Sequence, residues 1–323
     1  MRAVVITGPG GPDVLTVAIM PDPEPGPGEL VLDVRAAGVN RADLLQRAGH
    51  YPPPPGAPEW PGLEVAGVVR AVGAGVHGWA PGMRAAALLA GGGYAEQVVV
   101  PADLALVVPD DVADDEAAAL PEALATAWSN LDEAGARAGE SILVRGGSGG
   151  IGTVAVQLAA ALGLRVLATA GGPSRVARVA SLGAEVFDHR EDGLADRVLA
   201  ATDGRGVDVI LDVLGAGGLE DNVRMLATGG RLMVIGLQQG RRGTLDLGAL
   251  MARRGRVVTT TLRSREPDDK ARIVAGVRAH AWPLVAAHRV RGLVHARLPL
   301  SEAGEAHRLL DSGDVFGKLV LIP

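Results

Sequence analysis

The stretch from Ser141 to Gly152 constrains the fold most strongly, because an apolar strand runs directly into a glycine-rich loop and an amphipathic segment. Gly147, Gly149 and Gly152 fit the spacing G-x-G-x-x-G, and apolar residues recur at helical spacing over 153–162. A tight turn between a strand and a helix start aims backbone N–H groups at an anion, and the helix dipole favours its negative charge. The pattern predicts the diphosphate site of a dinucleotide-binding domain. A glycine turn that only permits close packing is the alternative.

Strands and helices alternate from residue 141 onward, which is typical of a parallel sheet with helices on both faces. The predicted strands cover 141–145, 165–169, 185–188, 207–212, 230–235 and 256–262. The predicted helices between them cover 152–162, 173–182, 193–201 and 217–227. We therefore expect a doubly wound Rossmann sheet, of the α/β class, in this half of the chain.

The first part of the chain has a different pattern, with short strands separated by glycine and proline turns. This pattern favours a closed or partly closed β-barrel. The last segment has strands near 293–298 and 317–322 around a helix at 301–312, and it resembles material that returns to the first domain. We expect domain limits of 1–115, 116–262 and 263–323.

Composition excludes several classes of site and partner. A net charge of −6 argues against a nucleic-acid surface. The chain has no cysteine, which excludes disulfides, thiolate zinc sites and a cysteine nucleophile. The N-terminus reads as a strand rather than a signal peptide, and no apolar run is long enough to span a membrane, so we expect a cytoplasmic protein without a membrane partner.

The second strand of the alternating region indicates which dinucleotide is bound. An NAD site usually has Asp or Glu at the end of this strand, but here it ends in Thr169, Ala170, Gly171 and Gly172. Arg175 follows, and a guanidinium there suits the 2′-phosphate of NADP. His189, after the third strand, is a second candidate for this phosphate. The alternatives are a surface arginine in a first helical turn and a solvated loop histidine.

The segment from Gly62 to Gly73 resembles the medium-chain dehydrogenase/reductase superfamily, whose zinc enzymes read G-H-E-x-x-G-x-V here. Leu63 stands where the zinc-binding histidine would be. This is similar to the zinc-free quinone oxidoreductase branch, which includes zeta-crystallin. The stretches 40–47, 49–51 and 53–56 look most like the tumour-suppressor-inducible quinone oxidoreductases and their bacterial relatives.

The resemblance covers the whole chain and implies a GroES-like barrel domain, a Rossmann domain, NADPH as cofactor, no metal and a homodimer. It also implies a set of residues along the cofactor. Asn40, Asp43 and Thr126 would border the nicotinamide, as would Gly236, Leu237 and Lys318, while Ser148, Gly149, Gly150, Ile151 and Gly152 would meet the diphosphate. Arg175 matches the family's basic residue for the 2′-phosphate, and His189 sits where some members have tyrosine. Arg145 stands where many members have histidine.

Tyr51 is the one candidate for a catalytic side-chain acid, and packing against Pro52 to Pro55 is its alternative role. We expect an NADPH-dependent, zinc-independent oxidoreductase that passes a hydride to a quinone or another conjugated carbonyl compound. A reductase of enone or alkenal double bonds is the nearest alternative. A non-catalytic NADPH-binding protein, as among crystallins, is the alternative from another class.

Overall fold

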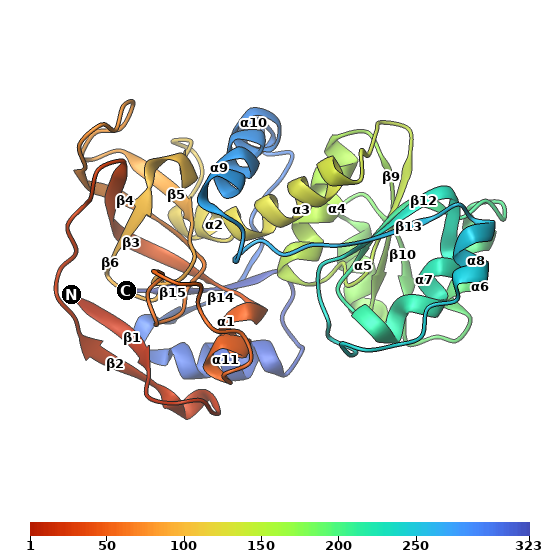
Figure 1. Cartoon of the computed structure of the whole chain (residues 1–323), viewed down its shortest axis with the longest axis horizontal. Coiled ribbons are helices and arrows are strands. Elements are labelled where there is room, and N and C mark those ends of the chain that lie inside the picture. Colours follow the sequence, from red (N-terminus) through yellow and green to blue (C-terminus); the bar gives the residue numbers. More distant parts are fainter. The chain divides into compact units, whose positions relative to one another are not determined.

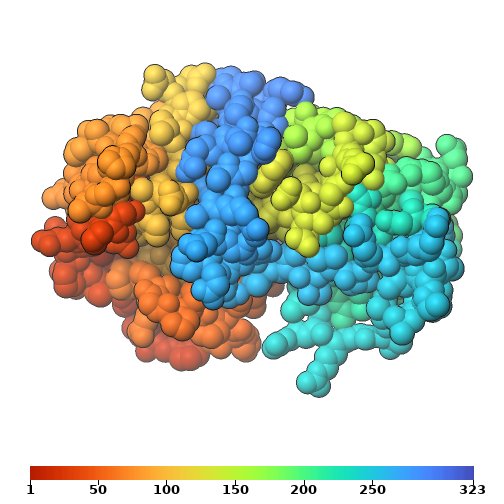
Figure 2. Space-filling view, turned by 45° about the horizontal axis from the view of Figure 1, so that its top comes forward, coloured from red at the N-terminus to blue at the C-terminus, as the bar shows by residue number.

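The computed structural model describes all residues from Met1 to Pro323. The chain divides into two compact units: unit 1 comprises Met1–Ala125 and Leu262–Pro323, and unit 2 comprises Thr126–Thr261. Unit 1 is thus built from both ends of the sequence, coloured red to yellow and blue in Figure 1 and Figure 2, and unit 2 is the green to cyan middle. The sequence pattern predicted domain boundaries after residues 115 and 262.

Unit 1 is organised on a seven-stranded sheet in which β3 is the longest strand. The strand order is β14-β15-β3-β4-β5-β7, and β6 pairs with β3 outside this path. All pairs are antiparallel except β14 with β15. The strands are β3 (Glu29–Val39), β4 (Glu64–Val72), β5 (Arg84–Leu88), β6 (Gln97–Pro101), β7 (Ala105–Val107), β14 (Val294–Pro299) and β15 (Lys318–Ile322). A separate hairpin joins β1 (Arg2–Ile6) to β2 (Leu15–Ile19).

The helices of unit 1 are short and lie between the strands. They are α1 (Arg41–Arg47), α2 (Asp114–Ala118), α9 (Pro267–Gly276), α10 (Trp282–Ala286) and α11 (Ala303–Asp311). A π-helical turn, Val277–Ala281, joins α9 to α10. The long helix α3 (Pro121–Glu133) starts in unit 1 and continues into unit 2. Pro121 cannot continue a helix from α2, so α2 ends before it and α3 starts on it.

Unit 2 is a six-stranded parallel sheet in the order β10-β9-β8-β11-β12-β13. In chain order this is 3-2-1-4-5-6, the doubly wound arrangement of Rossmann domains. The strands are β8 (Ser141–Val144), β9 (Arg165–Ala170), β10 (Glu185–Asp188), β11 (Val207–Asp212), β12 (Leu226–Val234) and β13 (Arg256–Thr259) (Figure 1). The parallel sheet expected from the alternation is therefore confirmed.

The helices of unit 2 are α4 (Gly150–Ala161), α5 (Pro173–Ala180), α6 (Leu194–Ala201), α7 (Leu219–Met225) and α8 (Leu247–Ala252). Residues from α6 and α7 pack on Leu143, Leu167 and Ile210 of three neighbouring strands, which makes the core of one sheet face. Helices α4 and α5 pack against β8, β9 and β10. The helix expected over 217–227 is shorter, because its first turn is a 3-10 helix at Gly215–Gly218 and β12 starts at Leu226.

None of the helices is both long enough and apolar enough to cross a membrane.

Candidate cofactor and acceptor sites

The glycine loop of unit 2 joins the end of β8 to the start of α4. Gly146 has a φ of +77°, and its carbonyl accepts the backbone N–H of Gly149 at 3.1 Å. A Cβ at position 152 would lie 2.1 Å from the carbonyl oxygen of Gly146, so only glycine lets the helix start this close to the loop. The N–H of Thr153 makes the first helical bond, to Gly149, which leaves the N–H groups of Gly150, Ile151 and Gly152 open to an anion. The loop fits a diphosphate.

Of the predicted diphosphate contacts, Ser148 and Gly149 lie in this loop, and Gly150, Ile151 and Gly152 form the start of α4. Thr169 on the neighbouring strand β9 fixes the start of the turn: its hydroxyl accepts the N–H of Gly146 at 3.1 Å and its carbonyl accepts the N–H of Gly147 at 2.8 Å. These bonds tie the loop to the sheet on one side, while the helix start stays accessible. The turn is thus held in shape before any ligand binds.

A basic cluster, defined as Arg175, His189 and Arg190, surrounds the glycines that follow β9. A Cβ at Gly171 would lie 3.0 Å from Cε1 of His189 and 3.1 Å from Nε of Arg190. A Cβ at Gly172 would lie 3.0 Å from Nη1 of Arg190. Arg175 is in the first turn of α5. The two glycines therefore leave room for basic side chains at the position where an NAD site usually carries an acid.

Asp188, a carboxylate next to this cluster in the chain, accepts hydrogen bonds from the backbone. It accepts the N–H of Arg190 and the N–H of Gly172, each at 2.9 Å, and these bonds hold the pKa of Asp188 below its usual range. Burial lowers the pKa of His189 most, and the charges of Arg145, Arg190 and Arg175 lower it further, while the charge of Asp188 opposes them. The local field is positive, which suits a phosphate dianion.

Arg145 extends this positive region toward the point where the strand order of the sheet reverses, between β8 and β11. It is buried, and its Nη1 donates to Oδ1 of Asn222 at 2.6 Å. Asn222 donates in turn to Oδ1 of Asp212 at 3.0 Å, and the other oxygen of Asp212 accepts the N–H of Gly215 at 2.7 Å. Nε of Arg145 is buried without a partner. Ligands of open α/β sheets bind at this reversal point.

In unit 1, Asn40 and Lys318 meet over a buried carboxylate. Nζ of Lys318 donates to Oδ1 of Asn40 at 2.6 Å and forms an ion pair with Glu64. Nδ2 of Asn40 donates to Oε1 of Glu64 at 2.9 Å, and Oε2 of Glu64 accepts the N–H of Glu122. Glu64 is fully buried and Lys318 is 3% exposed. This arrangement fixes the side-chain amide of Asn40 in one orientation.

Two further carboxyl groups of unit 1 are poised to hold a proton near neutral pH. Burial raises the pKa of Asp43 to about 6, although the N–H groups of Asn40 and Gly62 and the charge of Lys318 oppose the rise. Burial, together with the charge of Glu64, raises the pKa of Glu122 to about 8. Both groups therefore carry a proton in acid, and Glu122 still carries one at pH 7.

Tyr51 lies in the loop between α1 and β4, where Arg263 supports it. Cζ of Arg263 is 5.4 Å from the centre of the tyrosine ring, and Nη1 donates to the carbonyl of Tyr51 at 3.2 Å. The same guanidinium donates to Ala90 and Gln46. The ring is partly exposed, so packing and a role toward a ligand are both compatible with its place.

The remaining predicted residues lie in unit 2. Thr126 is buried in α3, where its carbonyl accepts from the Asn130 side chain. Gly236 and Leu237 follow β12; a Cβ at Gly236 would lie 2.7 Å from the carbonyl oxygen of Val213, and Leu237 is 52% exposed. Both follow the carboxyl end of a strand, the edge where such sheets bind ligands.

Sequence reasoning missed several residues that the structure brings into these sites. Arg190 directly follows His189, so the dipeptide was a usable signal. Glu64 follows Leu63 within the motif that carried the resemblance, and it could have been paired with Lys318. Arg263 and Asn222 have no local signal, because Gln46 and Arg145, to which they bond, are distant in sequence.

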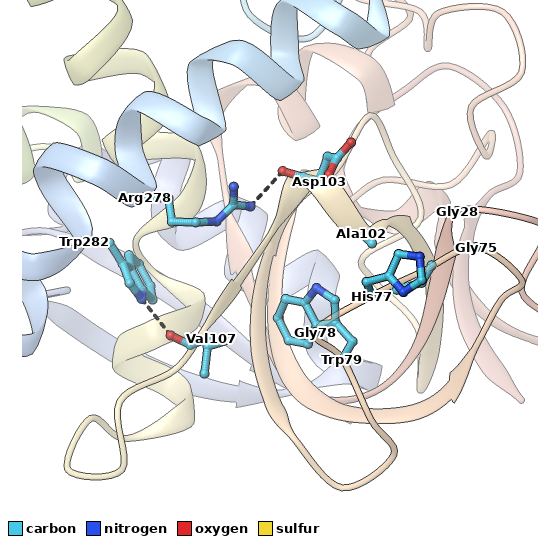
Figure 3. A pocket seen from close by; sticks show the side chains of 11 residues that line it. Gly28, Gly75, His77, Gly78, Trp79, Ala102, Asp103, Val107, Arg278 and Trp282 are labelled. Atoms are coloured by element: carbon cyan, nitrogen blue, oxygen red, sulfur yellow. Dashed lines mark hydrogen bonds between the residues drawn. The ribbon is translucent and has the colours of Figure 1, made fainter.

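A separate surface pocket of about 540 Å³ lies in unit 1, beside β7 (Figure 3). Its lining includes Trp79, His77 and Trp282, whose indole donates to the carbonyl of Val107 at 2.7 Å. Arg278 donates to the carbonyl of Asp103 at 3.1 Å at its rim. None of the residues predicted from the sequence lines this pocket. It is not the site described above.

No group of three or more His, Cys, Asp or Glu side chains is placed to hold a metal ion. Leu63 occupies the position of the superfamily's zinc-binding histidine, and the chain has no cysteine. These residues do not fit a zinc site.

Two family models match this chain. "Alcohol dehydrogenase GroES-like domain" matches residues 26–110, and "Zinc-binding dehydrogenase" matches residues 150–275. The rat protein named quinone oxidoreductase is 32% identical over all of this chain and 98% of its own length.

Solved structures give the same result. The Escherichia coli quinone oxidoreductase complexed with NADPH has a TM-score of 0.89 at 28% identity, with full coverage of both chains. A structure described as an NAD-dependent alcohol dehydrogenase also has a TM-score of 0.89, at 33% identity and full coverage of both chains. The GroES-like unit, the Rossmann-type sheet and these similarities place the chain in the quinone oxidoreductase-like branch of the medium-chain dehydrogenase/reductase superfamily.

Proposed function

We propose that this protein is a zinc-independent oxidoreductase that uses NADPH to reduce a quinone or a related conjugated carbonyl compound. The observation that carries the proposal is the basic cluster around Gly171 and Gly172, where an NAD site would present an acid. When bound, NADPH supplies the hydride, and the protein's contribution is binding and alignment.

The residues of unit 2 divide the binding of the cofactor between two anionic groups. The open N–H groups at the start of α4 receive the diphosphate. Arg175, Arg190 and His189 receive the 2′-phosphate, and two backbone N–H bonds fix the orientation of the Asp188 carboxylate beside them. One similar structure is complexed with NADPH and another is described as NAD-dependent, so similarity alone leaves the cofactor open. We therefore assign the preference of this chain for NADPH over NADH to Arg175, Arg190 and His189.

The direct test of the cofactor is to compare NADPH and NADH binding in Arg175→Ala and Arg190→Ala. Each variant should weaken NADPH binding by about 1–3 kcal/mol, as for a lost charge-assisted contact, and should leave NADH binding nearly unchanged. Arg178→Ala is the matched control, because Arg178 is an exposed arginine on the same helix α5. Equal losses for both cofactors would show that these arginines do not bind the phosphate.

On the acceptor side, the proposed contacts come from unit 1. Lys318 and Glu64 hold the amide of Asn40, and Arg263 holds the backbone of Tyr51. The Tyr51 hydroxyl is the proposed donor to the acceptor oxygen as negative charge develops there. Its position after α1 and ahead of a proline run gives it a constrained backbone.

Reduction of an enone or alkenal double bond is the alternative within the same chemistry, because both acceptors present an electron-poor carbon conjugated to a carbonyl. A steady-state panel of quinones and alkenals at matched NADPH separates the two. Turnover of alkenals alone would replace the quinone assignment. NADPH binding without turnover of any acceptor would favour the non-catalytic alternative.

We further propose that the protein belongs to the tumour-suppressor-inducible subfamily. We also propose that it forms a homodimer through β13. This strand is the edge of the unit 2 sheet and would otherwise expose unpaired backbone groups. Thr260 donates to β12, so the N–H of Thr259 points away from the sheet, and Thr259→Pro should split a dimer without disturbing the fold. Light scattering that gives a monomer mass for the wild type at micromolar concentration would count against the dimer.

A further inference from the structure

Four buried polar side chains in unit 1 form a continuous chain of hydrogen bonds. The proposed function gives no role to three of them, Arg47, Tyr94 and His307. Asp43 and Arg47 come from α1, Tyr94 precedes β6 and His307 lies on α11. The Tyr94 hydroxyl is 3.2 Å from Oδ2 of Asp43 and 3.1 Å from Nε2 of His307, and Nη1 of Arg47 is 3.3 Å from Nδ1 of His307. Asp43, Tyr94 and His307 are 0% exposed, and Arg47 is 7% exposed.

The direction of every bond in this chain is fixed by chemistry. An arginine only donates, so Nδ1 of His307 accepts, and the ring proton must be on Nε2. Nε2–H then donates to the Tyr94 oxygen, which leaves the Tyr94 hydroxyl proton for the Asp43 carboxylate. Burial and the charge of Arg47 lower the pKa of His307 to about 3, which keeps the ring neutral.

Asp43 stands at the end of this series of hydrogen bonds, and its carboxylate also accepts N–H groups at two points of the backbone. Oδ2 accepts the N–H of Asn40 at 2.8 Å, and Oδ1 accepts the N–H of Gly62 at 2.9 Å. Tyr94 reinforces the second point, because its own N–H donates to Pro61 at 3.0 Å. The two points bracket the segment 40–62, which contains Tyr51.

The packing at Gly62 shows how little freedom that end of the segment has. Its φ is +110°, and a Cβ there would lie 2.5 Å from Cα of Gly93 and from the backbone nitrogen of Tyr94. The Gly62 backbone is therefore pressed against the residues that carry the Tyr94 ring. A change in the Tyr94–Asp43 bond is transmitted to Gly62 through both contacts.

We propose that Tyr94, His307 and Arg47 are positioning residues that orient the Asp43 carboxylate and, through it, align segment 40–62 for reduction of the acceptor. The proposal rests on the proposed function, since alignment matters only if the acceptor is held by this segment. It goes beyond that function because it makes the turnover rate depend on three side chains that act through Asp43 and need no contact with cofactor or acceptor.

The other charged groups around this chain set its electrostatic surroundings. Lys318 and Arg263 act on Asp43 and favour its ionised form. Glu64 acts on Tyr94 in the same direction as Asp43, and both oppose loss of the phenolic proton. Asp311 and Arg308 act on Arg47 with opposite signs. With the ring of His307 neutral, the Tyr94 hydroxyl is the side-chain donor to Asp43, and its loss should raise the pKa of that carboxyl.

The test compares Tyr94→Phe with Trp282→Phe. Tyr94→Phe removes the one atom that links Asp43 to His307 and keeps the ring. Trp282→Phe also removes a buried donor from unit 1, at 2.7 Å from Val107, but has no bond to segment 40–62. Tyr94→Phe should lower kcat about tenfold or more, leave the NADPH dissociation constant within about twofold, and move the acid limb of kcat to higher pH. Trp282→Phe should change none of these.

A second pair of variants tests the directed bonds. A glutamine amide supplies a donor in place of Nε2–H, so His307→Gln should retain more of kcat than His307→Leu. If Tyr94→Phe and Trp282→Phe lower the melting temperature but share wild-type kcat and pH dependence, the chain is structural only and the proposal is wrong.

Two measurements without turnover separate failure of this proposal from failure of the proposed function. In ¹⁵N spectra, His307 should show the Nε2–H tautomer and no titration between about pH 5 and 8. Amide exchange at Asn40 and Gly62 should accelerate in Tyr94→Phe. If the wild type turns over no acceptor while both results hold, the function is wrong and the alignment stands. An Nδ1–H tautomer, or unchanged exchange, overturns the positioning chain.

Discussion

The two units hold their polar groups in opposite ways. In unit 1 two buried carboxylates are saturated: Glu64 accepts from Lys318, Asn40 and the backbone of Glu122, and Asp43 accepts from two backbone N–H groups and Tyr94. In unit 2 the start of α4 and Nε of Arg145 remain unsatisfied. Saturated groups fix geometry and open groups bind, so damage to unit 1 should cost stability or turnover, and damage to unit 2 should cost cofactor affinity.

The largest effect is expected at the saturated ion pair. Lys318→Met leaves Glu64 buried without its cation, and removing one partner of a buried pair costs about 3–5 kcal/mol. Urea denaturation measures this loss. Lys318→Met combined with Glu64→Gln should recover part of it, since the uncompensated charge is then gone. A double variant no more stable than the single one would contradict the pairing.

The next effect tests the open site of unit 2. Gly152→Ala places a Cβ against the carbonyl of Gly146 and should weaken NADPH and NADH binding on the order of a hundredfold, about 2.7 kcal/mol. Gly11→Ala in unit 1 is the control, because nothing lies within 4 Å of the Cβ that it adds. Cofactor titration by fluorescence measures both. Equal affinity losses in the two variants would mean that the close approach at Gly152 is not what shapes the site.

Tyr51→Phe tests turnover and leaves the Lys318–Glu64 ion pair and the glycine loop of unit 2 unchanged. It keeps the ring over Arg263 and removes the hydroxyl, so kcat should fall roughly 10²-fold if that hydroxyl donates mainly in the transition state. The NADPH dissociation constant and the melting temperature should not change. Wild-type turnover of quinone would leave Tyr51 as a ring held by Arg263 and the prolines.

The smallest expected effect is a pH dependence of stability. Asp43 and Glu122 have folded pKa values of about 6 and about 8, above their unfolded values, so the folded state binds protons that the unfolded state has lost, and stability falls as pH rises through this range. His307, lowered to about 3, acts oppositely: its contribution is full above its unfolded pKa and is lost as pH falls toward 3.

Between about pH 4 and 6 the contributions of Asp43 and His307 change in opposite directions and cancel, and between pH 6.5 and 8 only the Glu122 contribution still changes. Urea denaturation should show stability falling over that window by up to about 1.4 kcal/mol per pH unit. Glu122→Gln should flatten the slope. A wild type that gains stability from pH 6.5 to 8 would contradict the raised pKa of Glu122.

The sequence predicted the parts of this molecule whose signals are local. The glycine loop, the alternation of strands and helices and the position of Arg175 all lie within short windows, and the parallel sheet followed from them. A local rule also explains one helix end, since Pro121 separates α2 from α3.

The networks of unit 1 were not predictable in the same way. The bond between Arg47 and His307 joins residues 260 apart in sequence, and Arg263 meets Gln46 across 217. Each of these side chains alone reads as an ordinary surface residue or a satisfied core residue. Only the folding of the two chain ends into one unit brings them together.

The most direct test of the account is one turnover experiment with the wild-type protein, a quinone and either NADPH or NADH at equal concentration. Loss of reduced-cofactor absorbance, with matching formation of hydroquinone, reports the reaction. We expect turnover with NADPH at a kcat/KM at least about tenfold above that with NADH, a preference that Arg175→Ala removes. No turnover with any quinone, or a preference for NADH, would contradict it.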